Sequence, residues 1–495
     1  MRLLSAVLAL ALAVPTLAQK IDPYAIDKLV ASSLRAWQIP GAAIAIVHND
    51  RIVYLKGYGS KDMSGTDPVG PDTLFQIAST SKAFTTAAMA MLVDEKLLSW
   101  DDPVRKHVDY FHLSDPCADA SVTLRDIVSH RTGLSRHDEL WDNSPLSREE
   151  VIRRMGHVDL ARPFRTAYQY QNIMFITAGE AVANASGMPW DEFVRTRLFV
   201  PLGMTRTITS DAQWEAASDR AAGHRWDSDR GQVSPQRPIE TQTLGAGGAI
   251  KSTARDMANW IRFQLADGFF DKHRFVSAEA IAETKMPQTV IRLENATRDS
   301  NPETSLISYG MGWVVQDYRG ELLVSHSGSL NGFRTHVDLF PKRGIGFVVL
   351  LNAGRSMAAV ALRNSLADML NAKAARDWNA YYLMLDGRAA EKEKKAKEER
   401  LAKRRTGTTP SHPLADYVGK YDSPAYGSAT VTLVNGQLVL EWSRITVPLT
   451  HWHYDVFTAE SPIDDLEEMV TFGTAGDGMV KTLTIFGQTF TRDAP

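Results

Sequence analysis

Residues 76–84 have the sequence Gln-Ile-Ala-Ser-Thr-Ser-Lys-Ala-Phe, and residues 79–98 are rich in Ala, Met, Phe and Leu. This composition predicts a buried helix on which Ser79 and Lys82, three residues apart, share a face. A serine hydroxyl is a weak nucleophile that needs a neighbouring base, and a lysine in a closed pocket loses its proton more readily than one in water. We therefore predict Ser79 and Lys82 as a catalytic pair, although a helix cap also explains Ser-x-x-Lys.

Two later segments supply partners for such a pair. Tyr170-Gln171-Asn172 offers a tyrosine that acts as a base or proton relay near cations, and an asparagine able to donate to and accept from a substrate amide. His326-Ser327-Gly328-Ser329 ends a predicted edge strand. There Gly328 lets a substrate acyl chain lie against the strand. The N–H groups of Ser79 and Ser329 form a predicted oxyanion hole. The predicted catalytic residues are Ser79, Lys82 and Tyr170, and the predicted substrate-binding residues are Asn172, His326, Ser327 and Gly328.

The order of elements around these segments indicates an α/β domain over residues 19–375. Residues 41–47 and 51–58 predict two antiparallel strands around a turn. Three further strands are predicted later in the chain, at residues 322–324, 334–340 and 346–351. Helical patterns at 21–37 and 356–374 flank them, and mostly helical patterns fill 100–245. We therefore expect an antiparallel sheet covered by helices, with an all-helical insertion.

The C-terminal quarter has a different pattern. Residues 387–405 are a run of both charge signs with Glu four positions before Lys, which predicts a solvated helix within a linker over 376–412. Because the run contains both acidic and basic residues, we do not expect it to be a segment that binds nucleic acid or a membrane. Beyond it, Asn435-Gly436 separates two alternating apolar runs and predicts a hairpin. Together with further strand patterns it indicates a small all-β sandwich or barrel over 413–495.

Taken in order, these motifs resemble the serine β-lactamase and penicillin-binding protein family: Ser-x-x-Lys, Tyr-x-Asn about ninety residues later, and a His/Lys-x-Gly strand. The chain is most similar to the branch that contains class C β-lactamases, D-stereospecific peptidases and esterases. Residues 126–134, 201–204 and 247–253 resemble further landmarks of that branch. The resemblance covers about residues 20–375, and the tail resembles an accessory β-domain of some members.

The resemblance implies a serine hydrolase that cleaves an ester or peptide bond of a small-molecule or peptide substrate through a Ser79 acyl-enzyme. Lactamases of this branch usually have Lys-Thr-Gly where this chain has His326-Ser327-Gly328, and a histidine is largely neutral at pH 7. This difference favours esterases and peptidases. A β-lactamase or D-alanyl-D-alanine carboxypeptidase remains an alternative, as does a penicillin-binding sensor that is acylated once without turnover.

Other features narrow the function. The net charge of -3 argues against general nucleic-acid binding. Cys117 is the single cysteine, so the chain has no intramolecular disulfide or cysteine-type zinc site. His451 and His453 predict a polar strand face rather than metal ligands, and we expect no metal or cofactor. His130 is predicted to support a loop, because no Gly-x-Ser-x-Gly motif accompanies it for an ordinary triad.

The N-terminus has the pattern of a signal peptide. Arg2 precedes an apolar run over residues 3–14, and small residues precede a cleavage point after Ala18. The run is shorter than the roughly 20 apolar residues that a membrane-spanning helix needs, which disfavours an uncleaved membrane anchor. We therefore expect residues 1–18 to be removed, no integral membrane segment in the mature protein, and a periplasmic or secreted location.

Overall fold

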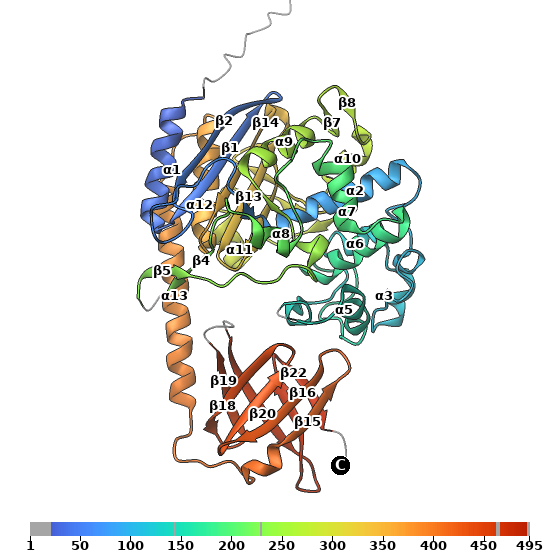
Figure 1. Cartoon of the computed structure of the whole chain (residues 1–495), viewed down its shortest axis with the longest axis vertical. Coiled ribbons are helices and arrows are strands. Elements are labelled where there is room, and N and C mark those ends of the chain that lie inside the picture. The colour runs from blue at the N-terminus through green and yellow to red at the C-terminus, as the bar shows by residue number, and fades with distance from the viewer. Residues whose placement is uncertain (1–20, 143, 228–229, 462–465, 493–495) are drawn as a thin grey trace, which may run out of the picture.

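The computed structural model describes residues 21–142, 144–227, 230–461 and 466–492. The predicted signal peptide, residues 1–18, lies outside the described residues. A mixed helix-and-sheet region forms the upper part of the molecule, a long helix descends along its side, and a separate β-structure lies below (Figure 1).

An eight-stranded sheet organises the upper region, and its strand order is β2-β1-β14-β13-β12-β11-β10-β9. Every neighbouring pair is antiparallel. The first hairpin therefore joins the late strands through the β1–β14 pairing. The strands are β1 (Gly41–His48), β2 (Arg51–Gly59), β9 (Thr289–Val290), β10 (Ile307–Tyr309), β11 (Val314–Tyr318), β12 (Glu321–Leu330), β13 (Phe333–Phe340) and β14 (Ile345–Leu351).

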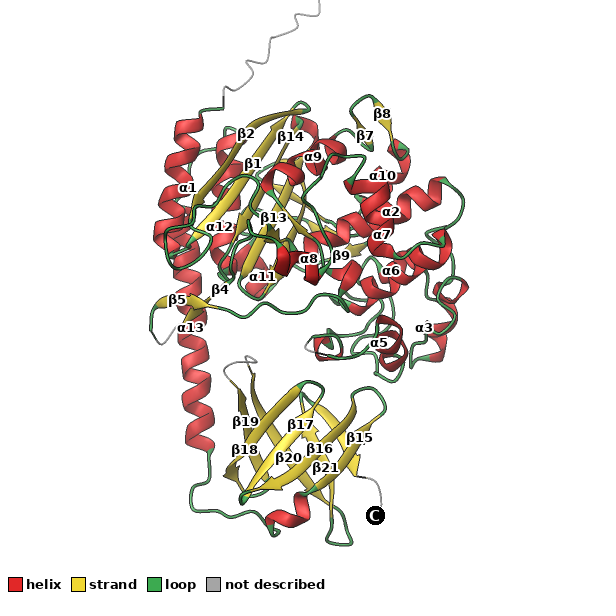
Figure 2. Cartoon of the chain, viewed as in Figure 1, coloured by secondary structure: helices red, strands yellow, loops and turns green. Residues whose placement is uncertain are grey.

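Each face of the sheet buries a separate hydrophobic cluster. On β1, Ile44 and Ile46 face helices α1 (Pro23–Trp37) and α12 (Ser356–Leu370), whereas Ala43 and Ala45 face α2 (Ser81–Asp94) and α9 (Ala254–Leu265). This alternation follows the two-residue period of a strand. The helices on the two faces are visible in Figure 2. The predicted fold class, an antiparallel sheet covered by helices, is confirmed.

The segment between β2 and β9 contains residues 100–245, the predicted all-helical insertion. The segment is mostly helical, but short two-stranded pairs interrupt it, and one of them, β4–β5, lies within 100–245. Its remaining helices are η1 (Ala78–Thr80), η2 (Val104–Lys106), α3 (Pro116–Ser121), α4 (Leu124–Ile127), η3 (Asp138–Leu140), α5 (Arg148–Met155), α6 (Ile173–Ser186), α7 (Trp190–Val194), η4 (Arg195–Phe199), α8 (Asp211–Ala216), η5 (Gly245–Gly247) and α10 (Ala278–Thr284). Its short strands are β3 (Phe75–Gln76), β4 (His224–Asp227), β5 (Gln232–Pro235), β6 (Lys251–Ser252), β7 (Phe269–Phe270) and β8 (His273–Arg274). Helix α11 (Asn295–Ser300) and the turn η6 (Pro341–Arg343) lie among the late strands.

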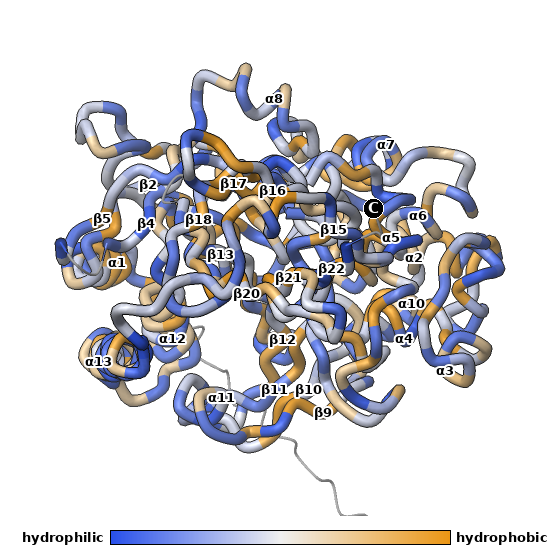
Figure 3. Tube along the Cα trace, turned by 90° about the horizontal axis from the view of Figure 1, so that it is seen from below, coloured by the Kyte–Doolittle hydropathy of each residue, from blue (hydrophilic) through white to orange (hydrophobic). Residues whose placement is uncertain are grey.

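The charged run as far as Lys403 lies in a single helix, α13 (Trp378–Lys403), whose first turns pack on the upper region through the buried Trp378 and Tyr382. After η7 (Leu414–Tyr417), the chain forms a closed eight-stranded antiparallel barrel. Seen from below, α13 stands at the side while the barrel strands overlie the upper region (Figure 3). The strands are β15 (Gly419–Ser423), β16 (Gly427–Val434), β17 (Gln437–Trp442), β18 (Ile445–His453), β19 (Val456–Ser461), β20 (Leu466–Thr474), β21 (Val480–Ile485) and β22 (Gln488–Arg492).

The barrel contains the predicted hairpin turn. Val434 pairs with Gln437, so Asn435 and Gly436 are the two loop residues. Both have positive φ angles, 51° and 81°, as a two-residue turn of this hand requires. Barrel closure comes from β15 pairing with β22, strands that are distant in sequence. Among the described residues, no helix is both long and apolar enough to span a bilayer.

Candidate active site

Ser79 lies in η1, the single turn that leads into α2, and its side chain is half-buried. The preceding Ala78 has a φ of 51°, in the left-handed region that a residue with a Cβ adopts only at a cost. This sharp turn packs against β12. Strand β11 pairs with β12 only as far as Ser325, and the Ile77 carbonyl lies against Gly328 beyond that point.

Lys82 points from the first turn of α2 towards Ser79 and is completely buried. Its Nζ lies 3.0 Å from Ser79 Oγ, 2.7 Å from Asn172 Oδ1 and 2.6 Å from the Gly247 carbonyl. Burial lowers the pKa of Lys82 well below its usual 10.5, Arg136 lowers it further, and Asp138 opposes the change. The predicted Ser79–Lys82 pair is therefore in direct contact.

Tyr170 also reaches the nucleophile. Burial raises the pKa of the Tyr170 phenol above its usual value, while a side-chain hydrogen bond with Ser79 and the nearby Arg136 oppose this. Lys82 Nζ lies 4.9 Å from the centre of the Tyr170 ring. The Ser79 hydroxyl is thus contacted by both predicted proton-handling residues.

His130 supports this tyrosine from behind. Its Nδ1 accepts a hydrogen bond from the Gln171 backbone N–H (3.1 Å), and its ring centre lies 4.3 Å from that of Tyr170. Burial lowers its pKa well below the usual value, so the ring is neutral. No hydrogen bond joins His130 to Ser79 within the described ranges, and its contacts are those of a residue that supports a loop.

Asn172 is engaged by the protein itself. Its Oδ1 accepts from Lys82, and its Nδ2 donates to Asp138 Oδ1 (2.9 Å). Asp138 also accepts from Trp141 Nε1 (2.8 Å) and pairs with Arg136 (2.6 Å). In this structure the Asn172 amide oxygen therefore binds Lys82. Asn172 helps to orient the lysine and connects it to the Asp138 carboxylate.

His326 on β12 is not among the residues that line the cleft, and only 4% of its surface is exposed. Its Nδ1 donates to the Ser327 carbonyl (2.7 Å), so Nε2 is left to accept from the Tyr309 hydroxyl (2.9 Å). Burial, and then the Lys82 charge, lower its pKa to about 3. The neutral histidine expected from the sequence is therefore present, and its predicted contact with substrate stays a prediction.

The rest of the third segment divides between two faces of β12. Gly328 is buried, and a Cβ there would come within 2.1 Å of the Ile77 carbonyl. Glycine is therefore required by the nucleophile turn, and the predicted contact of Gly328 with a substrate acyl chain stays a prediction. Ser327 is exposed and pairs with His336 on β13, on the opposite face from His326, and its substrate-binding role stays a prediction.

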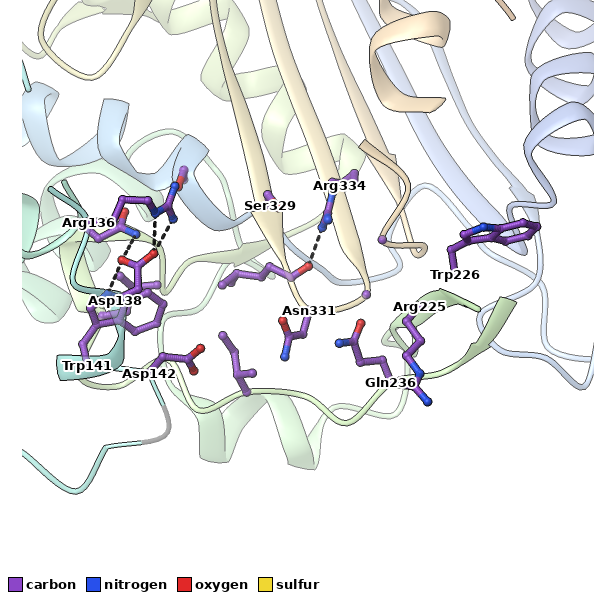
Figure 4. A pocket seen from close by; sticks show the side chains of 17 residues that line it. Arg136, Asp138, Trp141, Asp142, Arg225, Trp226, Gln236, Ser329, Asn331 and Arg334 are labelled. Carbon is purple, nitrogen blue, oxygen red and sulfur yellow. Dashed lines mark hydrogen bonds and ion pairs between the residues drawn. The ribbon is translucent and has the colours of Figure 1, made fainter. Parts of the chain in front are cut away.

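Ser79, Asn172 and Ser329 line a cleft of about 360 Å³. Figure 4 shows the tip of the β12–β13 hairpin, with Ser329 and Asn331, in the middle of this cleft. Arg136, Asp138 and Trp141 lie on one side of the tip, and Arg225, Trp226 and Gln236 on the other (Figure 4). A substrate bound beside Ser79 would therefore meet Ser329 and extend to either side.

The barrel contacts two loops that line the cleft. The Tyr426 hydroxyl, in the turn between β15 and β16, lies 2.8 Å from Nδ1 of His137, the neighbour of Asp138. Arg444, in the β17–β18 turn, pairs with Glu240 (2.5 Å), the neighbour of the lining residue Ile239. His451 and His453 bond instead to the backbone of Tyr454 and Arg405.

Sequence reasoning missed Arg136, Asp138, Trp141 and Arg334, which line the cleft. The Arg-x-Asp spacing of the first two carries no signal of its own. A weak signal lies nearby in Gly133, whose φ of 90° and close approach to the Arg162 carbonyl require glycine. That glycine marks a constrained loop, although it does not identify the residues that the loop presents.

The comparisons with known proteins agree with this geometry. The family model described as "Beta-lactamase" matches residues 26–371. The chain belongs to the β-lactamase family. A second model, "Domain of unknown function (DUF3471)", matches residues 403–494, which include the barrel.

Relatives within the family are named hydrolases. The chain is 30% identical over 423 residues to "Unguisins hydrolase ungD'" of Aspergillus campestris, an alignment that covers 82% of this chain and 76% of that protein. It is 28% identical to "Unguisins hydrolase ungD" of Aspergillus violaceofuscus, covering 66% of this chain and 60% of that protein. It is 27% identical to "Protein flp" of Staphylococcus aureus, covering 66% and 62%. Family and relatives together make this β-lactamase-family chain a serine hydrolase.

Solved structures show the same fold, barrel included. The octameric penicillin-binding protein homologue from Pyrococcus abyssi has a TM-score of 0.62 at 20% identity and covers 95% of this chain and 99% of its own. The crystal structure of SurE has a TM-score of 0.57 at 20% identity, with the same coverage. At this level of identity the likeness concerns the fold alone.

Proposed function

We propose that this β-lactamase-family chain is an exported serine hydrolase that cleaves an ester or peptide bond through a Ser79 acyl-enzyme. The observation that carries the proposal is the 3.0 Å contact between Ser79 Oγ and the buried Nζ of Lys82. A lysine with a depressed pKa is a competent base for a hydroxyl that is otherwise a weak nucleophile.

The hydrogen bonds of Lys82 support its role as that base. In the neutral amine, two N–H bonds are used by Asn172 Oδ1 and the Gly247 carbonyl, and the lone pair faces Ser79 Oγ. Ser79 then donates its proton to Lys82 as Oγ forms a bond to the substrate carbonyl carbon. Tyr170, bonded to the same hydroxyl, returns a proton to the departing alcohol or amine as its bond to the carbonyl carbon breaks.

A water molecule completes the cycle by attacking the acyl-enzyme ester. The same groups take its proton and return one to Ser79 Oγ, so that the acid is released and the hydroxyl is restored. We place the oxyanion of both steps against the backbone N–H groups of Ser79 and Ser329, because both residues line the cleft. Ser329 does so near the end of β12. Such preorganised donors are usually the largest source of rate enhancement.

Hydrolysis with turnover is preferred over single acylation because two relatives are named hydrolases of unguisins. The neutral His326 favours an ester or peptide substrate over a β-lactam, since the fixed positive charge expected of a lactamase is missing from that position.

Rapid mixing with p-nitrophenyl acetate tests the proposal. We expect a burst of p-nitrophenol of about one equivalent, followed by steady turnover, and an acetyl group on the peptide that contains Ser79. Ser79→Ala should lose the burst, the turnover and the acetyl group. A burst without turnover would instead support the sensor, and acetylation of another residue in the wild type would overturn the assignment of Ser79.

Export is the part of the proposal carried by residues 1–18 alone. Expression with this segment in a bacterial host should give a periplasmic or secreted product whose first residue is Gln19, as determined by mass spectrometry. A cytoplasmic product that retains Met1 would contradict export and leave the catalytic proposal standing.

A further inference from the structure

Arg136 and Asp138 form an ion pair on one wall of the cleft (Figure 4). Asp138 Oδ2 accepts a hydrogen bond from Arg136 Nε at 2.7 Å and lies 2.6 Å from Nη2. His137, between them, has a φ of 48°, in the left-handed region that residues other than glycine rarely adopt. Strained backbone persists only where the surrounding contacts hold it, and it is common at functional sites. The strain therefore points to a function for the pair that this residue connects.

Contacts hold His137 in this conformation through both nitrogens of its ring. Its Nδ1 lies 2.8 Å from the Tyr426 hydroxyl of the barrel, and its Nε2 lies 2.9 Å from Ser135 Oγ. The Ser135 carbonyl in turn accepts a hydrogen bond from the side-chain amide of Gln171, the neighbour of Tyr170. The loop that carries the ion pair is thus fixed to the segment that carries this tyrosine.

The two members of the pair reach the proposed catalytic groups by different routes. The guanidinium carbon of Arg136 lies 5.1 Å from the centre of the Tyr170 ring. Asp138 Oδ1 accepts a hydrogen bond from Asn172 Nδ2 (2.9 Å), and Asn172 Oδ1 accepts one from Lys82 Nζ (2.7 Å). The cation of the pair therefore lies over the tyrosine ring, whereas the carboxylate is one side chain away from the lysine.

Their opposite charges make the two residues act in opposite directions on Lys82 and Tyr170. Burial is the main cause of the low pKa of Lys82, and Arg136 lowers it further while Asp138 raises it. Burial raises the pKa of Tyr170, the hydrogen bond with Ser79 and then Arg136 lower it, and Asp138 raises it. The other titratable side chains nearby are neutral, because burial lowers the pKa of the histidines and raises that of the tyrosines: His130, His326, Tyr168 and Tyr309.

We propose that Arg136 and Asp138 are positioning residues that together set the protonation states of Lys82 and Tyr170, and thereby the pH range in which Ser79 reacts. This inference rests on the proposed function, because it concerns the groups that would activate Ser79. Each charge offsets the other, so that removal of either one should move the active range, and removal of both should restore it.

Water weakens this electrostatic coupling in the free enzyme. The Arg136 side chain is 59% exposed and that of Asp138 is 23% exposed, and solvent screens exposed charges. A substrate that occupies the cleft displaces this water, and charges interact more strongly where water is excluded. The coupling should therefore be stronger in the enzyme–substrate complex than in the free enzyme.

The pH dependence of acylation tests the pair. Rapid mixing with p-nitrophenyl acetate, from about pH 5 to about pH 10, gives kcat/KM for the free enzyme and the burst rate at saturation for the bound complex. Arg136→Gln should move both limbs of each profile to higher pH by about half a unit or more, because a cation is lost. Asp138→Asn keeps the shape of the side chain and should move both limbs to lower pH. Each shift should be larger in the burst rate than in kcat/KM.

Three further variants serve as controls. The double variant Arg136→Gln with Asp138→Asn removes both charges and should return the limbs towards their wild-type positions. Arg136→Lys keeps the charge but not the forked guanidinium, so the limbs should stay in place even if the rate falls. Arg237→Gln removes the same charge from an exposed position next to the cleft residue Gln236 and should move neither limb. Limbs that move in the same direction in both single variants, or lower rates with unmoved limbs, would overturn the proposal.

Titration of Lys82 without catalysis separates this proposal from the proposed function. The free energy of unfolding, measured by urea denaturation with and without Lys82→Met, gives a difference that begins to change at the folded-state pKa of Lys82. Arg136→Gln should raise the pH of this change, and Asp138→Asn should lower it. Such shifts in a protein that shows no Ser79 acylation would preserve the pair and refute the hydrolase mechanism. A Lys82 titration that neither variant moves, in an active enzyme, would refute the pair alone.

Discussion

The barrel contains residues that favour a stable fold, whereas the cleft contains residues that are costly to bury or to hold in position. In the barrel, apolar residues such as Leu440 and Phe490 fill the interior, and the Asn435-Gly436 turn has the residues that its geometry requires. In the cleft, Lys82 is buried and Ala78 holds a left-handed φ angle. Functional sites commonly sacrifice local stability in this way. The difference suggests that substitutions in the cleft change rate, whereas substitutions in the barrel change stability.

Replacing the buried lysine gives the largest expected effect. Lys82→Met keeps most of the volume but removes the base, and we expect kcat to fall by about 10²-fold or more. The free energy of unfolding should stay the same or rise, because a desolvated amine is removed. Steady-state kinetics and urea denaturation on the same preparation measure both quantities.

The pH dependence of stability sharpens this prediction. The folded-state pKa of Lys82 is depressed below 10.5, so between the two values the unfolded chain binds more protons than the folded one. Wild-type stability therefore rises with pH in that window, and the advantage of Lys82→Met should shrink from pH 7 towards pH 10. An advantage that is constant over this range would show that Lys82 remains charged when folded.

Tyr170→Phe is the next most severe change. Loss of the hydroxyl that bonds Ser79 should lower kcat about 10²-fold with little change in melting temperature, because the ring packing against His130 is kept. The double variant with Lys82→Met should lose less than the product of the two single effects, since the residues act as a unit. A near-wild-type kcat in Tyr170→Phe would mean that the tyrosine only packs.

A barrel core substitution should have the reverse pattern. Leu440 is buried inside the barrel, and Leu440→Ala should lower the free energy of unfolding by about 2–5 kcal/mol. The kcat of the protein that remains folded should be unchanged. A fall in kcat comparable with that of Tyr170→Phe would break the distinction between the two regions.

Tyr426→Phe tests the contact between the barrel and the loops of the cleft, and should have the smallest effect. It removes the hydroxyl that bonds His137, a contact worth about 0.5–1.5 kcal/mol. Because His137 precedes Asp138, we expect KM to rise a few-fold while kcat changes less. The control Tyr454→Phe alters an exposed barrel tyrosine and should leave KM unchanged.

Features set by nearby residues were predictable from the sequence. The Ser79–Lys82 contact follows from three-residue spacing on a helix, and the barrel hairpin follows from Asn435-Gly436. The β1–β14 pairing was also expected in outline, since strand patterns stand at both ends of the domain. In each case a local pattern leaves few alternatives.

Features that depend on distant contacts were not predictable. Asp138 reaches Lys82 only through Asn172, which lies 34 positions further along the chain. Gly328 was predicted to contact substrate, but the sequence does not reveal the close approach of the Ile77 carbonyl that requires glycine there. Arg334 has no motif around it, and its place in the cleft wall depends on the pairing of β12 with β13.

The way the barrel meets the rest of the chain has an evolutionary consequence. Its contacts through Tyr426 and Arg444 fall on loop residues beside the cleft, whereas Ser79 and Lys82 are held by the sheet and its helices. Mutations in the barrel hairpins can thus reshape which substrates are accepted while the nucleophile stays intact. A lineage could diversify its substrates by drift in this accessory domain and leave the ancestral chemistry unchanged.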